Sequence, residues 1–170
     1  LDGRKETFQE LVQKGLGGFL VRNMESYGIL DTMGLTSRIV LDANIYTMNN
    51  RAEAFWMKKG ILGDTVPLEL NAKELVHRNN KNSELTVYGY TPMMVSVQCV
   101  QKTMDHCNHA CVQYVLKDRY QKEFRGVCSC EFCYNTIYNT LPTSLLKEKE
   151  KAEKLGVKAY RLSFTTETQQ

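Results

Sequence analysis

The sequence predicts an α/β protein built on parallel strands. Short apolar runs end abruptly in polar residues, as strands buried on both faces of a parallel sheet do. Helical patterns of crossover length stand between these runs. With 170 residues, 42% of them hydrophobic, the chain can bury one core, so we expect a single domain over residues 1–170.

The first strand is expected at 19–21, between two helices. Residues 1–15 carry apolar side chains at helical spacing ahead of a glycine-rich stretch. The run Phe-Leu-Val at 19–21 then ends at Arg22 and Asn23, and residues 25–33 predict the next helix.

The same order repeats along the chain. Further strands are expected at 39–41, 66–68, 85–88 and 157–164, and further helices at 51–59, 72–78 and 143–155.

Polar side chains follow several of these runs. The carboxyl ends of parallel strands meet at one edge of a sheet, where substrate sites gather. We therefore expect Asp42 and Glu69 to be catalytic. We expect Arg22, Asn23 and Asn71 to bind the substrate. Arg22 would pair with a substrate carboxylate, because a guanidinium binds a carboxylate through two parallel hydrogen bonds. Helix capping is the alternative, and it is favoured for Asn71.

Five parallel strands fit either an open doubly wound sheet or part of a (β/α) barrel. No G-x-G-x-x-G follows a strand, which weakens the dinucleotide-binding form of the open sheet. An eight-stranded barrel needs roughly 200 residues. We therefore expect a partial TIM-type barrel, with missing N-terminal strands or a second chain covering the open sheet edge.

All six cysteines lie within residues 99–133. Such clustering indicates one shared site, and thiolates suit zinc or an iron–sulfur cluster. A disulfide framework and buried inert thiols are the alternatives. Polar neighbours such as Asp105, His106 and Glu131 favour the metal site.

Composition and the absence of two motifs limit the classes of function that the sequence supports. A net charge of +3 does not indicate a nucleic-acid binder, and no apolar run approaches the ~18 residues of a membrane span, so we expect a cytoplasmic protein. The histidines are His77, His106 and His109, and neither G-x-S-x-G nor H-E-x-x-H occurs. Recognised hydrolase motifs are thus absent from the sequence.

Several short motifs resemble the collagenase-like peptidase family, whose catalytic type is unknown. They are Glu-Leu-Asn at 69–71, the stretch 85–94, Tyr-Val-Leu-Lys-Asp-Arg at 114–119, Phe-Cys at 132–133 and Ile-Tyr-Asn at 137–139. The resemblance implies the later part of a (β/α) barrel, with a cysteine-rich metal-binding insertion over 99–139 before the last strand.

The resemblance also implies an iron–sulfur enzyme. A [4Fe-4S] cluster would be held by Cys99, Cys107, Cys111 and Cys133, with zinc as the alternative cofactor. Cys128 and Cys130 have no counterpart in the family pattern. The implied activity is oxygen-independent hydroxylation of an RNA base or a related small substrate.

Two other functions remain open. One is proteolysis, as the family name claims. The other is a zinc-stabilised binding module closed by Cys107, Cys111, Cys130 and Cys133. RNA or a small carboxylate is the expected partner, since cations interleave with aromatic residues over 102–125, although a solvated surface has the same composition.

Overall fold

The computed structural model describes residues 2–167, and the side chains from Glu6 on. The chain forms two compact units. The α/β unit contains the residues up to Thr86 together with Glu148–Arg161. The cysteine unit contains Val87–Lys147 and the residues from Leu162 on.

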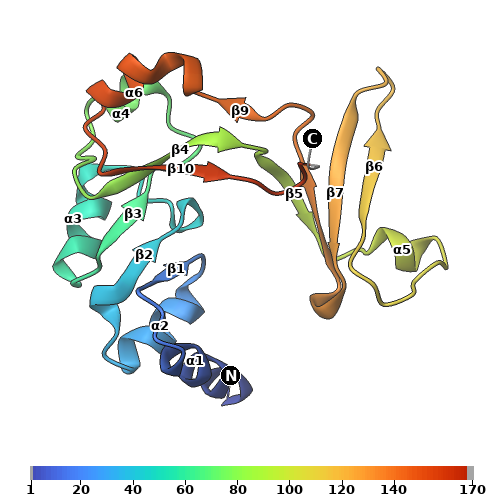
Figure 1. The fold of residues 1–170 in the computed structure, drawn as a ribbon, viewed down its shortest axis with the longest axis horizontal. Helices are drawn as coiled ribbons and strands as arrows, with labels where there is room; N and C mark the ends of the chain where they lie inside the picture. The colour runs from blue at the N-terminus through green and yellow to red at the C-terminus, as the bar shows by residue number, and fades with distance from the viewer. Residues whose placement is uncertain (1, 168–170) are drawn as a thin grey trace. The chain divides into compact units, whose positions relative to one another are not determined.

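The α/β unit is built around parallel strands (Figure 1). The strand order of its sheet is β1-β2-β3-β4-β10, in which β1 to β4 pair in parallel. The strands are β1 (Phe19–Val21), β2 (Ile39–Leu41), β3 (Gly63–Thr65), β4 (Ser83–Gly89) and β10 (Ala159–Ser163). The helices are α1 (Asp2–Gln13), α2 (Met24–Thr32), α3 (Asn50–Lys58), α4 (Ala72–Leu75) and α6 (Lys149–Lys154).

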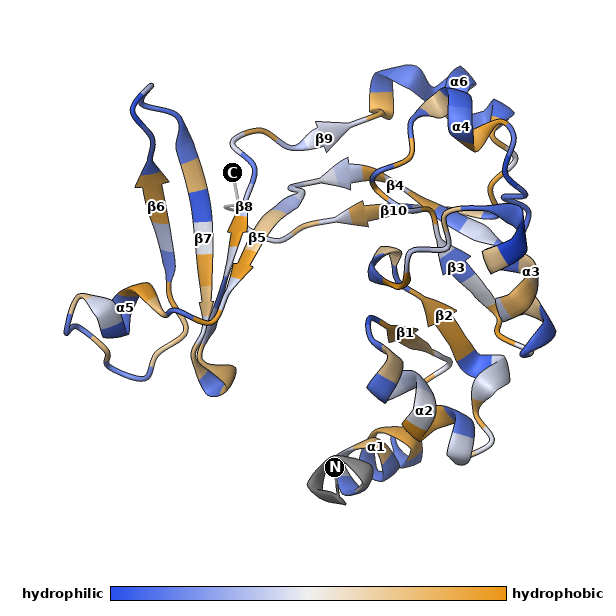
Figure 2. Cartoon of the chain, turned by 180° about the vertical axis from the view of Figure 1, so that it is seen from behind, coloured by the Kyte–Doolittle hydropathy of each residue, from blue (hydrophilic) through white to orange (hydrophobic). Residues whose placement is uncertain are grey.

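A compact apolar core holds β1 and β2 against α2 and α3. Leu30, Ile39 and Leu41 are fully buried in it. The rings of Tyr27 and Trp56 meet edge to face, with their centroids 4.8 Å apart. Figure 2 shows the apolar residues along β1 and β2 that form this core.

The third strand lies before the predicted 66–68 run, at Gly63–Thr65. It contains no apolar side chain, yet all three of its residues are buried. A Cβ atom on Gly63 would come within 2.3 Å of the Asn82 carbonyl oxygen, so only glycine fits this close strand pair. Asp64 is buried because Arg78 pairs with it.

The cysteine unit contains a separate four-stranded sheet (Figure 1). Its strand order is β5-β8-β7-β6, and every pair is antiparallel. The strands are β5 (Pro92–Ser96), β6 (Gln113–Lys117), β7 (Glu123–Ser129) and β8 (Tyr134–Tyr138), with the short helix α5 (Val100–Thr103) between β5 and β6. A two-residue strand, β9 (Thr143–Ser144), pairs antiparallel with the end of β4.

The predicted partial (β/α) barrel is therefore wrong. The first sheet is mixed, because β9 joins it antiparallel, and the described residues close no barrel. The cysteine-rich stretch forms much of a second, antiparallel sheet. The exposure of Gln113–Lys117 alternates along the strand, as expected when one face of a sheet is buried.

Throughout residues 2–167, every helix is too short or too polar to cross a bilayer.

Candidate metal centre

Two tight turns carry most of the cysteine thiols. In the first, which follows α5, Cys107 and Cys111 flank His109, whose backbone is left-handed with a φ of 56°. The amide of Ala110 donates to Asn108 Oδ1 at 3.1 Å and stabilises this turn. Both ends of the turn therefore carry a thiol.

The second turn joins β7 to β8. Cys130–Phe132 forms one turn of 3-10 helix, and Cys133 ends it in a left-handed conformation with a φ of 51°. The Cys133 amide donates to the Cys130 carbonyl at 3.2 Å. The two cysteines of this C-x-x-C turn have the sequence spacing that is common among zinc ligands.

The two turns meet through three ligand atoms. The Sγ atoms of Cys107 and Cys130 and a ring nitrogen of His109 all lie within 4.8 Å of one another. Cys130 is nearly buried, whereas Cys107 and His109 are exposed. The pairing of β6, β7 and β8 creates this contact, because it returns the chain to the first turn.

The thiols of Cys133 and Cys111 lie outside this three-atom group but near enough to affect Cys130 electrostatically. Burial raises the pKa of Cys130, and the neighbouring thiols of Cys107, Cys133 and Cys111 raise it further. Gathered thiolates repel one another, so a cation between them would be strongly stabilised.

Cys99 lies beside Cys128 in the interior of the same unit. Their Sγ atoms are 3.7 Å apart, and only 7% of Cys99 and 0% of Cys128 is exposed. Burial raises the pKa of Cys128 to about 12, with Cys99 and Cys130 adding to it. Of the four predicted ligands, Cys107 lies within 4.8 Å of Cys130, Cys111 and Cys133 affect Cys130 electrostatically, and Cys99 pairs with Cys128.

The predicted strand-end residues Arg22 and Asp42 are in contact. Arg22 Nε lies 3.0 Å from Asp42 Oδ2, at the carboxyl ends of β1 and β2. Arg161 of β10 contacts the other oxygen, Asp42 Oδ1, at 2.8 Å and also pairs with Glu84. Asp42 thus bridges two guanidinium groups.

The other predicted substrate residues lie in local structure. Asn23 caps α2 by accepting from the Ser26 amide at 2.8 Å. Asn71 caps α4 in a capping box with Glu74, which is the capping that the sequence favoured. Glu69 is exposed in the loop before this cap. Their roles toward a substrate stay predictions.

A buried ion pair in the α/β unit was not predicted. Arg78 and Asp64 are 6% and 3% exposed. Arg78 donates to Asn80 Oδ1 and to the Thr47 carbonyl, and Ser83 Oγ donates to Asp64. Apolar periodicity carries no signal for such a pair, because both side chains lie outside the apolar runs.

Part of the expected basic patch in the cysteine unit contacts polar groups of the same unit. Lys117 pairs with Glu123 at 3.0 Å, and Arg125 donates to the Thr166 carbonyl at 2.6 Å. Asp118 accepts from the amides of Tyr120 and Lys122 and so shapes the β6–β7 turn. Two of the five cations in 102–125, Lys117 and Arg125, thus contact groups of the cysteine unit itself.

The donor set suits a single metal ion. Tetrahedral zinc with ~2.3 Å Zn–S bonds places its sulfur ligands about 3.8 Å apart. The ligand atoms of Cys107, His109 and Cys130 lie within 4.8 Å of one another, so all three could hold one ion. A cubane cluster holds its thiolates further apart, because iron and sulfide atoms lie between them.

Comparison with known proteins finds no match: no family model, curated protein or solved structure is similar to this chain.

Proposed function

We propose that the cysteine unit is a zinc-stabilised binding module. In this proposal Cys107, His109, Cys130 and Cys133 bind one zinc ion that fastens the two turns together. The convergence of Cys107, His109 and Cys130 within 4.8 Å carries the proposal. Mixed sulfur and imidazole ligation is common in structural zinc sites.

Cys133 is the favoured fourth ligand. It shares the C-x-x-C turn with Cys130. Burial is the largest cause of the raised pKa of Cys130, and the thiols of Cys107 and then Cys133 are the next largest. Four protein ligands leave no open coordination position, so the site stabilises structure and does not activate water.

Metal analysis of protein purified without air tests the proposal. We expect colourless protein with one zinc per chain and no sulfide. His109→Ala and Cys133→Ser should each lose most of the zinc, whereas Cys111→Ser, the matched thiol variant in the first turn, should keep it. Retention of zinc by His109→Ala together with its loss from Cys111→Ser would replace His109 by Cys111 in the ligand set.

A second candidate is the iron–sulfur enzyme that the family resemblance implies, acting on a small carboxylate. In this candidate Arg22, which lies beside Asp42 at the strand ends, would bind the acid. The Arg22 side chain is 61% exposed, so its guanidinium is accessible to an acid.

Cys99→Ser separates the two candidates. A cluster held by Cys99, Cys107, Cys111 and Cys133 would make the protein brown, and this variant would lose its iron and sulfide. In the zinc module the same variant keeps its metal, because Cys99 is not a ligand.

A further inference from the structure

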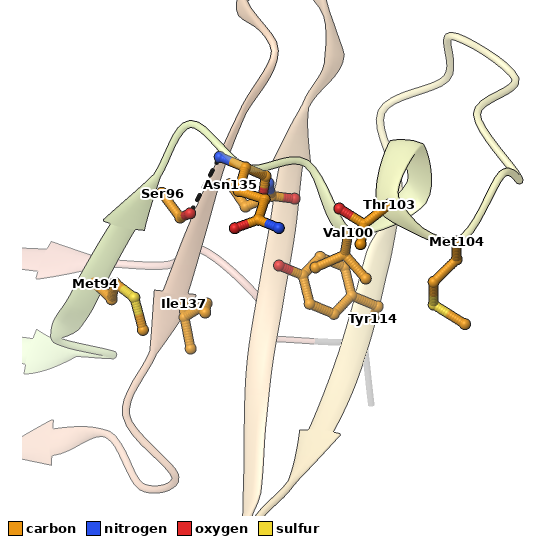
Figure 3. Close-up of a pocket in the computed structure, with 9 residues that line it drawn as sticks. Met94, Ser96, Val100, Thr103, Met104, Tyr114, Asn135 and Ile137 are labelled. Atoms are coloured by element: carbon orange, nitrogen blue, oxygen red, sulfur yellow. Dashed lines mark hydrogen bonds between the residues drawn. The ribbon is translucent and has the colours of Figure 1, made fainter.

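The sheet of the cysteine unit has an apolar hollow of about 270 Å³ on one face (Figure 3). Apolar side chains from β5, β8 and the α5 region form much of its wall, among them Met94, Ile137, Val100 and Met104. None of the proposed zinc ligands lines it. The hollow is therefore a feature separate from the metal centre.

Strand register explains why the hollow forms there. Ile137 pairs with Gly126, which pairs with Tyr114, so these three residues form one row across the sheet. Asn135 belongs to the next row on the same face, beside Cys128. Gly126 allows the Tyr114 ring to lie over this row, because a Cβ atom there would come within 2.2 Å of that ring.

Two residues that line the hollow each carry a buried polar atom without a hydrogen-bond partner in the described part of the chain. Asn135 is 1% exposed, and its Nδ2 donates to the Gln98 carbonyl at 3.0 Å. Its Oδ1 atom and the Tyr114 hydroxyl are buried with no hydrogen-bond partner among the described residues. Buried polar atoms without partners are costly, so a missing partner is expected beside them.

We propose that this hollow binds a small aromatic molecule that carries a hydroxyl or N–H group. The donor of the ligand would pair with Asn135 Oδ1, and the Tyr114 hydroxyl would donate to an acceptor of the ligand. The thioethers of Met94 and Met104 suit contact with an aromatic ring. Apolar walls with a few convergent polar groups are typical of small-molecule sites.

This site goes beyond the zinc module and does not depend on it. Zinc content is measured in the same samples, so failure of the hollow to bind is distinguishable from failure of the metal proposal.

Phenol is the probe, and toluene, which has a methyl group in place of the hydroxyl, is the matched control. Amide chemical shifts of the full chain are followed by NMR during titration with each. We expect saturable shifts at Tyr114, Asn135 and Ile137, with phenol about tenfold tighter than toluene.

Three variants test the assignment. Asn135→Leu should remove the preference for phenol. Tyr114→Phe keeps the ring over Gly126 and should weaken phenol binding several-fold, so the proposal remains testable if Asn135→Leu does not fold. Thr136→Val, at the neighbouring position on the other face of β8, should bind phenol as the parent chain does. Equal affinity for phenol and toluene, or no saturable shift because the hollow holds only water, overturns the proposal.

Discussion

The Sγ atoms of Cys99 and Cys128 lie 3.7 Å apart, buried in the cysteine unit behind the turns that carry the proposed zinc ligands. The six clustered cysteines thus form an interior pair and a second group of Cys107, Cys111, Cys130 and Cys133, of which Cys130 also packs against the pair. The two groups are expected to respond differently to substitution.

Cys128→Ala should lower the free energy of unfolding by about 1 kcal/mol, because it leaves a small cavity at a fully buried position, and should leave the zinc content unchanged. Cys130→Ala, two residues away, should lose the zinc. Urea unfolding and metal analysis measure the two effects. Loss of zinc from Cys128→Ala would place that thiol in the metal site.

Arg78→Met should lower the free energy of unfolding by about 3–5 kcal/mol, because it leaves the Asp64 carboxylate buried without its partner. Lys81→Met, an exposed control close in sequence, should change it by less than about 0.5 kcal/mol. Chemical denaturation checks both values. Equal, small effects would show that Asp64 does not need the ion pair.

Gly126→Ala should lower the free energy of unfolding by about 1–3 kcal/mol, because its Cβ would overlap the Tyr114 ring. In a Tyr114→Ala background the same change should cost much less. A double-mutant cycle measures this coupling, and additive costs would contradict the contact.

Asn71→Ala should lower the free energy of unfolding by about 1 kcal/mol, since the α4 cap is lost. Asn71→Asp keeps a capping oxygen and should remain near the parent value. Thermal or urea unfolding distinguishes the two variants. If Asp destabilises as much as Ala, the capping box is not what Asn71 contributes.

Arg161→Met should lower the free energy of unfolding by about 2 kcal/mol, because the partly buried Arg161 contacts both Asp42 and Glu84. Arg22→Met should cost less than about 1 kcal/mol, because that side chain is 61% exposed. Unfolding curves of the two variants give the comparison. If Arg22→Met lowered the free energy of unfolding more than Arg161→Met, Arg22 and not Arg161 would be the main stabilising partner of Asp42.

Strand pairing explains why the ligand set that we propose from the structure differs from the set expected from the sequence. The clustering of cysteines is visible in the sequence, and two members of the predicted ligand set, Cys107 and Cys133, belong to the proposed one. Cys130 and His109 come together only because β7 and β8 return the chain to the first turn. Spacing along the chain does not report that register.

The sequence by itself determined the parallel strands β1 and β2, the cap at Asn71 and the presence of one cysteine-rich region. Apolar runs, capping residues and local clustering are properties of neighbouring residues, so they can be read directly. Tertiary structure alone decided the polar strand β3, the antiparallel sheet around the thiols and the Arg161 contact with Asp42. Each of these features depends on residues that are distant in the chain. Their contacts supply the burial and the opposite charge that the local sequence pattern does not show.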